Sequence, residues 1–258
     1  NHPRVSEILR KASVYLEQWK QRPAFTGYQT RNPNQVKYQM AAIYATLQAE
    51  QIMYVGAPAS YEDSGQRIRM SHTVLEQKQG TCLDLAVLYA SCLEAAGLYP
   101  LLVFQKGHAF AGCWLEEETF ADCVADDISA LEKRVVDGAE AILLLECTDY
   151  TEGKNVNFER ALKHGKDHLR ETAKFECVMD IQRSRGSGIR PIPVRLEDVH
   201  PQENAVVEED GSADADSGIA APKELDTSLR GKTTEEEGPL TRAKVWERKL
   251  LGFSLRNT

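Results

Sequence analysis

The chain has 258 residues, with 39 acidic and 31 basic side chains, a net charge of −8 and six cysteines. This length is enough for one large domain or for one domain with appendages, and no apolar run is long enough to span a membrane. No signal peptide is visible, and we expect a piece of a longer protein because the first residue is Asn1 rather than Met.

The cysteines are scattered through apolar segments and form no CxxC pair. Such spacing favours free thiols in a reducing, cytoplasmic setting over a disulfide framework or a zinc ribbon. The six positions are Cys82, Cys92, Cys113, Cys123, Cys147 and Cys177.

The negative charge is concentrated in one stretch. Residues 203–237 contain eleven Asp or Glu and three Lys or Arg, so this stretch alone carries −8 and the rest of the chain is neutral overall. No aromatic residue occurs from Glu176 to Val245. A segment of this composition cannot bury enough surface to fold, so we expect a domain over 1–195 followed by an acidic disordered linker over 196–240. The neutral remainder lacks the basic excess of a nucleic-acid groove, and we expect no direct nucleic-acid binding by this fragment.

The last segment, 241–258, has an apolar face formed by Trp246, Leu250, Leu251 and Phe253. We expect it to be the helical start of a following domain that would cover this face.

In chain order, hydrophobic spacing predicts a mixture of helices and strands, and hence an α+β fold. The expected helices are Val5–Trp19, Pro33–Glu50, Cys82–Ala96, Ile128–Val136 and Asn157–Glu171. The expected strands are Ile52–Val55, Pro100–Gln105, Ala109–Leu115 and Ala141–Leu145, with an extended finish over Val178–Val194.

The stretch from Gly80 to Gly112 is the most informative part of the chain. Thr81 can cap a helix and Asp84 follows three residues later, which is a capping-box-like pattern. Cys82 then falls at the first helical position, and Gly97 is a natural C-terminal stop. The residues between are apolar on nearly every side, so we expect this helix inside the domain.

The position of Cys82 suggests nucleophilic chemistry. A thiol reacts as the thiolate, and the free N–H groups and dipole of a helix N-terminus lower its pKa. His108, at the mouth of the strand that follows, is a possible base, so the two residues form a candidate nucleophile–base pair. The alternative is that Cys82 fills a small space in the core and His108 is a hydrogen-bonded edge histidine.

Two other pairs of polar residues lie near the candidate site or at metal-ligand spacing. Gln77 and Gln79 precede the cysteine and are polar enough to contribute to an oxyanion pocket, although solvated loop glutamines explain them better. His164 and His168 lie one helical turn apart, a spacing that can bind zinc. Because there is no HExxH signature and no obvious further ligand, we expect them to face solvent and assign no metal and no cofactor.

The motifs Gly80-Thr81-Cys82-Leu83-Asp84, His108-Ala109-Phe110 and Glu146-Cys147-Thr148 together resemble the transglutaminase-like superfamily. That family has a G-x-C-x-D helix, an H-A-[WF] strand and a D-x-T strand. The resemblance implies Cys82 as nucleophile, His108 as base and Glu146 as the acid that orients the histidine. This sequence has Glu where the family has Asp, and the insert 116–140 lengthens the interval, so Asp122 and Asp126 remain alternatives for the acid.

Longer phrases, GQRIRMSHTVLEQKQGTCLDLAVLYASCLEAAGL and KGHAFAGCWLEEETF, resemble a domain of large bacterial multidomain helicase-like proteins, and the tail VWERKLLGFSLRN resembles the start of their next domain. The resemblance covers about residues 1–195 plus the tail. It implies a papain-like fold, with a central buried helix packed on an antiparallel sheet and further helices around it.

The function implied by the resemblance is acyl transfer on protein or peptide amides. Hydrolysis would make the protein a peptidase or amidase, and an amine acceptor would make it a transglutaminase. The alternative is an inactive peptide-binding or regulatory module. The expected partners are a protein or peptide substrate and other domains of the same full-length protein, with no membrane.

Overall fold

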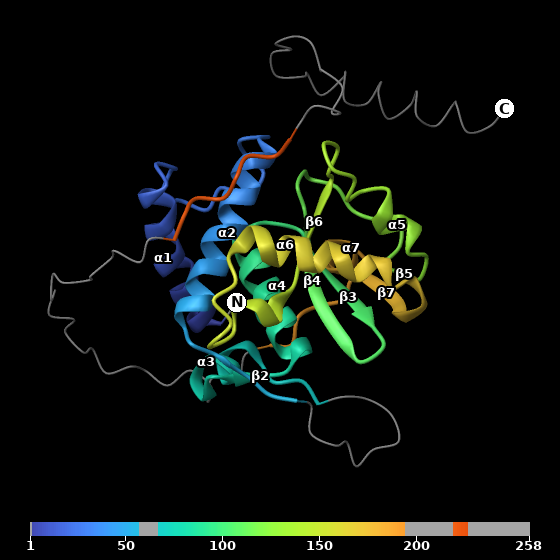
Figure 1. Ribbon diagram of the computed structural model, residues 1–258, viewed down its shortest axis with the longest axis horizontal. Helices are drawn as coiled ribbons and strands as arrows, with labels where there is room; N and C mark the ends of the chain where they lie inside the picture. Colours follow the sequence, from blue (N-terminus) through green and yellow to red (C-terminus); the bar gives the residue numbers. More distant parts are fainter. Residues whose placement is uncertain (1, 57–66, 194–218, 227–258) are drawn as a thin grey trace, which may run out of the picture. The chain divides into compact units, whose positions relative to one another are not determined.

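A five-stranded antiparallel sheet forms the framework in the computed structural model, which describes residues 2–56, 67–193 and 219–226 (Figure 1). The strand order is β5-β7-β3-β4-β6, and β1 and β2 form a separate parallel pair. The strands are β1 (Met53–Tyr54), β2 (Gln79–Gly80), β3 (Pro100–Gln105), β4 (His108–Trp114), β5 (Val124–Ala125), β6 (Ile142–Leu145) and β7 (Phe175–Asp180).

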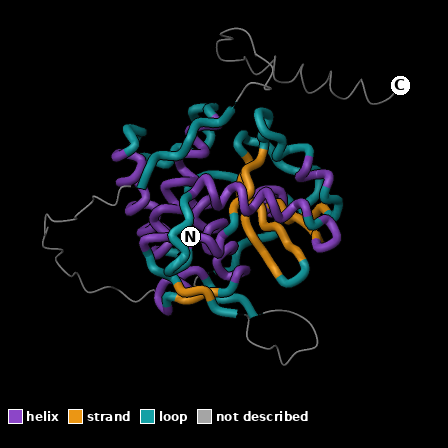
Figure 2. Tube along the Cα trace, viewed as in Figure 1, coloured by secondary structure: helices purple, strands orange, loops and turns teal. Residues whose placement is uncertain are grey.

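The described residues contain seven α-helices, some packed against the sheet and the others packed mainly on those helices (Figure 2). They are α1 (Pro3–Gln18), α2 (Pro33–Ala49), α3 (Ser71–Gln77), α4 (Cys82–Ala95), α5 (Ser129–Glu132), α6 (Phe158–Asp167) and α7 (Ile181–Gly186). Short 3-10 turns are η1 (Cys147–Tyr150), η2 (His168–Arg170) and η3 (Thr172–Lys174). The α+β prediction is therefore confirmed.

Helix α4 begins at Cys82, as predicted, because a capping box forms there. The Thr81 hydroxyl accepts from the Asp84 backbone N–H at 3.3 Å, and the Asp84 carboxylate accepts from the Thr81 N–H at 3.0 Å. After the C-terminal end of the helix, Gly97 has a φ of 79°, which favours glycine. The helix is buried along most of its length, so its N-terminus is held rigidly relative to the sheet.

Both faces of the sheet are covered. Alternate residues of β4 point to opposite faces: Ala111 and Cys113 join the core that contains α1, α2 and α4, whereas Phe110 and Trp114 join a second core with α5 and the β5–β6 connection. None of the helices in the described residues combines the length and apolar character that a membrane span requires.

Helix α6 packs closely against the edge strand β6, and a glycine of the helix makes this close contact possible. A Cβ atom on Gly165 would lie 2.7 Å from the carbonyl carbon of Leu144, so only glycine allows this approach. The backbone N–H of Glu146 also donates to the carbonyl oxygen of Ala161 at 3.1 Å. This close packing brings the end of α6 beside the end of β6.

Several predicted boundaries differ from the structure. The extended finish predicted over Val178–Val194 is wrong for residues 181–186, which form α7 because the Asp180 carboxylate caps this helix by accepting from the Arg183 N–H at 2.8 Å. The helix expected over Ile128–Val136 is only the single turn α5, and that over Asn157–Glu171 divides into α6 and η2. Helix α3 was not predicted.

Part of the predicted acidic linker contacts the folded helices. Residues 219–226 run beside α1 and α2 (Figure 1). The carbonyl oxygen of Ile219 accepts from the Trp19 indole at 3.0 Å, and the backbone N–H of Leu225 donates to the Asn34 side chain at 2.7 Å. The rest of the predicted linker from residue 196 and the predicted helical segment 241–258 lie outside the described residues.

Candidate active site

Strand pairing brings His108 and Glu146 together. Strand β4 starts at His108 and β6 ends at Leu145, and the antiparallel register that pairs Ala111 with Leu145 places the start of one beside the end of the other. The His108 Nε2 donates to the Glu146 Oε2 at 2.6 Å. The two sequence-predicted residues are thus in direct contact, although 38 positions separate them in the chain.

Glu146 is a buried carboxylate with three hydrogen-bond donors. Its Oε2 accepts from His108 and from His168, each at 2.6 Å, and its Oε1 accepts from the Thr148 backbone N–H at 2.8 Å. Burial alone would raise the pKa of Glu146, but the hydrogen bonds from the two histidines outweigh it and hold that pKa well below its usual range. The group is therefore ionised at neutral pH.

Cys82 is half-buried at the first position of α4. Burial raises the pKa of its thiol, but a hydrogen bond with His108 and backbone hydrogen bonds from Ala109 and Leu83 outweigh this effect and lower the pKa overall. The Leu83 N–H belongs to the first turn of the helix, where amides have no carbonyl one turn earlier to bond. The helix start and the histidine therefore act in the same direction on the sulfur.

His108 connects the other two groups. Burial lowers the pKa of its imidazole, but hydrogen bonds with Cys82 and Glu146 raise it to about 9. Because Nε2 is used by Glu146, the Nδ1 atom is the remaining polar atom of the ring. The side chain is 23% exposed, so the site is open to solvent.

Three other cysteines lie in a different environment. Cys92, Cys113 and Cys147 are fully enclosed in the core, and burial raises the pKa of each thiol, to about 12 for the first two. These thiols are inert fillers, which is the alternative that the sequence left open for Cys82.

The alternative acids and the glutamines lie elsewhere. Asp122 and Asp126 are exposed, and among the described residues neither hydrogen-bonds to His108. Gln77 is exposed and accepts from the Gln79 side chain at 3.4 Å, and no hydrogen bond described for either glutamine reaches Cys82.

Sequence reasoning missed the role of His168. The prediction that His164 and His168 face solvent holds only in part: their side chains are 36% and 28% exposed and line an open cavity, but His164 is hydrogen-bonded to Asp149 at 2.6 Å and His168 to Glu146. The His168 ring also stacks on Phe110, with ring centroids 5.0 Å apart. The sequence shows that the two histidines lie one turn apart, but this spacing does not tell which carboxylates they meet.

A cavity of about 420 Å³ opens beside these groups. It is lined by His108, Glu146 and His168 together with His164, Thr148, Asp149, Lys154, Asp167 and Glu171.

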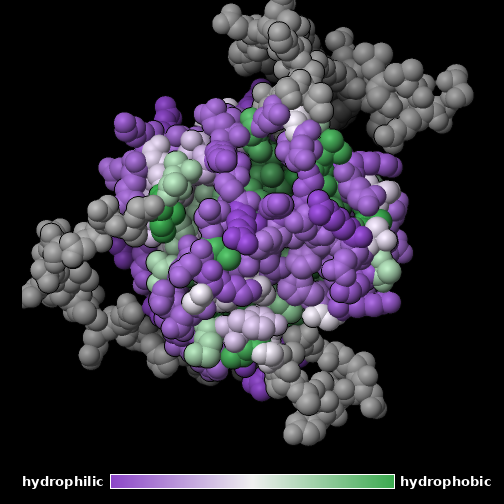
Figure 3. Space-filling model, viewed as in Figure 1, coloured by the Kyte–Doolittle hydropathy of each residue, from purple (hydrophilic) through white to green (hydrophobic). Residues whose placement is uncertain are grey.

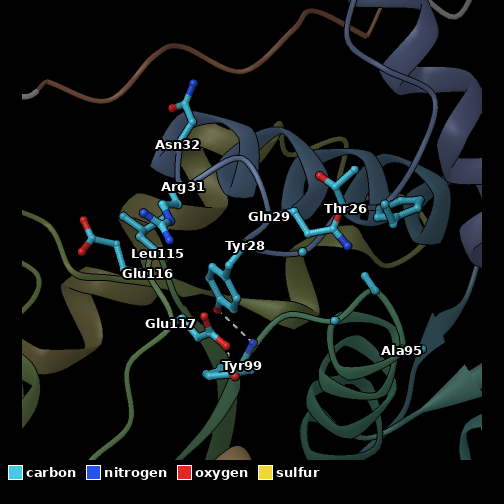
Figure 4. Close-up of a pocket in the computed structure, with 14 residues that line it drawn as sticks. Thr26, Tyr28, Gln29, Arg31, Asn32, Ala95, Tyr99, Leu115, Glu116 and Glu117 are labelled. Carbon is cyan, nitrogen blue, oxygen red and sulfur yellow. Dashed lines mark hydrogen bonds between the residues drawn. The ribbon is translucent and has the colours of Figure 1, made fainter. Parts of the chain in front are cut away.

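A larger cavity, of about 900 Å³, lies between the loop after α1 and the C-terminal end of α4 (Figure 4). There the Tyr28 hydroxyl accepts from the Tyr99 N–H at 3.0 Å and donates to the Trp114 carbonyl at 2.8 Å. This cavity contains none of the predicted catalytic side chains, so size alone does not identify the site.

Comparison of the chain with protein-family models, with curated proteins and with solved structures finds no match to any of them. A function for this chain is therefore inferred from the geometry of the site.

Proposed function

We propose that the protein is a cysteine-dependent acyl-transfer enzyme of the transglutaminase-like superfamily, with Cys82 as nucleophile, His108 as base and Glu146 as orienting acid. The observation that carries this proposal is the 2.6 Å hydrogen bond from His108 to a buried carboxylate. A half-buried cysteine at the first position of α4, whose thiol pKa is lowered by the same imidazole, supports it. A buried helix packed on an antiparallel sheet, with helices around it, supports the papain-like fold.

In the proposed reaction, the Cys82 thiolate attacks the carbonyl carbon of an amide. The backbone N–H of Cys82, at the first helical position, donates to the oxyanion of the tetrahedral intermediate. His108 then gives its Nδ1 proton to the departing amine as the C–N bond breaks, which leaves a thioester on Cys82. Glu146 holds Nε2 of the same ring and fixes its orientation, as in a Ser-His-Asp triad.

The thioester is resolved by water or by a second amine. His108 takes a proton from this nucleophile, the acyl group is transferred, and the thiolate is restored. We propose hydrolysis as the main outcome, which makes the protein a peptidase or amidase, because an open cavity borders His108, the group that would take a proton from the attacking water.

The surface near the sulfur favours a protein or peptide substrate. β2 leads directly into Cys82 and pairs with β1, so that Tyr54 lies opposite Gly80. Burial, and then the negative charges of Cys82 and Glu146, raise the pKa of the Tyr54 hydroxyl. Hydrophobic areas interrupt the mostly hydrophilic surface on the side of the molecule seen in Figure 3. Met53, Tyr54, Ile68 and Met70 are all exposed large hydrophobic residues, suited to apolar side chains of a peptide.

The free thiol that the mechanism needs is best maintained in a reducing compartment, and all six cysteines are free in the structure. We therefore propose a cytoplasmic protein whose further partners are other domains of the full-length chain.

The decisive experiment is site-resolved thiol labelling. Metal-free protein is treated with iodoacetamide at neutral pH, and the modified fraction of each cysteine is followed by peptide mass spectrometry. Cys82 should react at least ~10-fold faster than Cys123 and Cys177, which are equally half-buried, because its thiolate fraction is larger. In His108→Ala, this advantage should disappear.

An inactive peptide-binding module is the other candidate, because the same exposed apolar residues would bind a peptide without reacting with it. Equal, slow labelling of Cys82 and the two control cysteines would favour that module. Selective labelling would then justify a screen of peptide amides for hydrolysis, with Cys82→Ser as the inactive control.

A further inference from the structure

We propose that His108, Glu146 and His168 form a binding site for a divalent cation of the zinc type, and that an ion bound there blocks the reaction of Cys82. The binding half of this inference is independent of the proposed function. The inference that the ion blocks Cys82 rests on the proposed function, because it requires Cys82 and His108 to act as the reactive pair.

The three ligand atoms are already gathered. One atom from each residue lies within 4.8 Å of the other two, and both Nε2 atoms are 2.6 Å from the same carboxylate oxygen. Two imidazoles and one carboxylate are a ligand set typical of zinc sites that keep a fourth position open. With bonds of ~2.0–2.1 Å, ligands of a tetrahedral ion lie roughly 3.3 Å apart, so each of these contacts must lengthen by less than ~1 Å.

The three ligand residues belong to three separate parts of the fold, which fix their backbone positions. His108 starts β4, Glu146 follows β6, and His168 starts η2. The Gln105 side chain donates to the His168 carbonyl at 2.8 Å, and the Thr148 N–H holds the other Glu146 oxygen. Only side-chain rotation is needed to admit an ion, so little ordering opposes binding.

The surroundings leave room for an ion and its water. The 420 Å³ cavity beside the three ligands is also lined by the carboxylates of Asp149, Asp167 and Glu171. Arg170 is paired with Asp167 and Lys174 with Glu171, so these carboxylates are largely neutralised. Lys154 lines the same cavity and lies 3.7 Å from Asp149. The His168 side chain is 28% exposed, so an ion reaches its ligands directly from solvent.

Ion binding would remove the base. The cation takes the Nε2 electron pair of His108, the Nε2 proton is released to solvent, and the proton that remains on the ring is the one on Nδ1. The metal-bound ring carries only this one proton, so it can neither take a second proton from the Cys82 thiol nor form the imidazolium that accompanies the thiolate in the proposed reaction. Glu146, bound to the ion, no longer orients the ring for catalysis.

The first test measures binding. Protein stripped of metal with EDTA and kept reduced is titrated with Co²⁺ and Zn²⁺, by following Co²⁺ absorption and by competition with a chromophoric chelator. One equivalent should bind, and His168→Gln should weaken binding at least ~10-fold because it removes a ligand. His164→Gln is the matched control: it alters a neighbouring histidine of the same cavity and should change the affinity less than threefold.

Cys82→Ser should also keep the affinity within threefold, because the sulfur is not a ligand. The site is overturned if no equivalent of metal binds, if His168→Gln binds as tightly as wild type, or if His164→Gln or Cys82→Ser loses binding as fully as His168→Gln. Circular dichroism of each variant shows that a lost affinity does not reflect a lost fold.

The second test measures blocking as the ratio of Cys82 labelling rates without and with saturating Zn²⁺. This ratio should be at least tenfold in wild type, should return to one after EDTA, and should fall to near one in His168→Gln at the same Zn²⁺ concentration. Binding without slower labelling, or faster labelling with Zn²⁺, overturns the blocking half. If metal-free Cys82 is no faster than the control cysteines, the proposed function fails, while the titration still decides the binding site.

Discussion

Two buried carboxylates lie at the ends of two strands of the same sheet, β6 and β7, which β3 and β4 separate, and their donors differ. Asp180 ends β7 and is fully buried; it accepts from the Trp114 indole at 3.0 Å, the Phe120 N–H at 2.9 Å and the Arg183 N–H at 2.8 Å. Glu146 follows β6 and is 5% exposed, and two of its three donors are imidazoles.

The comparison shows that burial of a carboxylate does not by itself mark a functional site. Indole and backbone N–H groups keep their protons at every working pH, so Asp180 joins elements of the fold. Imidazole nitrogens can accept or release a proton, and the two imidazoles at Glu146 line an open cavity. The donors, and their access to solvent, distinguish the proposed catalytic carboxylate from the structural one.

The largest expected effect is on stability at Asp180. Asp180→Ala leaves two N–H groups buried without an acceptor and uncaps α7, so unfolding should become easier by about 3–4 kcal/mol. Urea denaturation measures this change. The exposed Asp126→Ala should shift the free energy by less than about 0.5 kcal/mol.

Cys82 labelling in folded Asp180→Ala should stay within twofold of wild type. A reactivity loss as large as that of a Glu146 variant would show that the two carboxylates are not separate in function.

The next largest effect is expected on both the free energy of unfolding and the labelling rate of Cys82. In Gly165→Ala, the new methyl group collides with the backbone of β6, which should destabilise the fold by about 2–3 kcal/mol and displace α6 from Glu146. Cys82 labelling in the folded variant should slow, because His168 moves away with η2. The matched control is Gly186→Ala in α7, where a Cβ meets nothing within 4 Å.

Glu146→Gln should show the opposite pattern from Asp180→Ala. The amide keeps the shape of the side chain but lacks the negative charge that holds the imidazole, so the Cys82 labelling rate should fall on the order of tenfold or more. The free energy of unfolding should change by less than about 2 kcal/mol. A labelling rate equal to that of wild type would remove Glu146 from the proposed triad.

The parts of the site that were predicted from the sequence are those indicated by short patterns of neighbouring residues. The start of α4 at Cys82 follows from Thr81 and Asp84, whose capping box needs only four consecutive residues. His108 and Glu146 were assigned through short motifs at strand ends, and the antiparallel register of β4 and β6 then brings them together.

The parts that sequence missed depend on packing between distant elements. His168 reaches Glu146 only because Gly165 lets α6 approach an edge strand, and no spacing rule within α6 reveals this. Helix α7 was missed because Pro191 and Pro193 suggested an extended finish, whereas the Asp180 cap acts earlier in the chain.

Glu50 is a third carboxylate for this comparison, and its donors are lysine side chains. Its substitution has the smallest expected effect on the free energy of unfolding. Its carboxylate bonds Lys11 at 2.6 Å and also Lys78. Burial raises the pKa of Glu50, but the hydrogen bonds from the two lysines outweigh it and lower that pKa overall. Glu50→Gln should destabilise the fold by about 0.5–1 kcal/mol at pH 7, since both lysines are largely exposed.

The sign of the pH dependence follows from the lowered pKa. A carboxyl whose pKa is lower in the folded state adds stability above its unfolded pKa of about 4.3, and this stability is lost as the pH falls through the folded pKa. The difference between wild type and Glu50→Gln should therefore be constant from pH 7 to about 5 and shrink at lower pH. It should also shrink in high salt, because the lysines are screened. Glu76→Gln, at an exposed position in α3, is the control for the substitution itself. A Glu50 difference that stays the same down to about pH 3 would mean that packing, and not charge, holds this carboxylate.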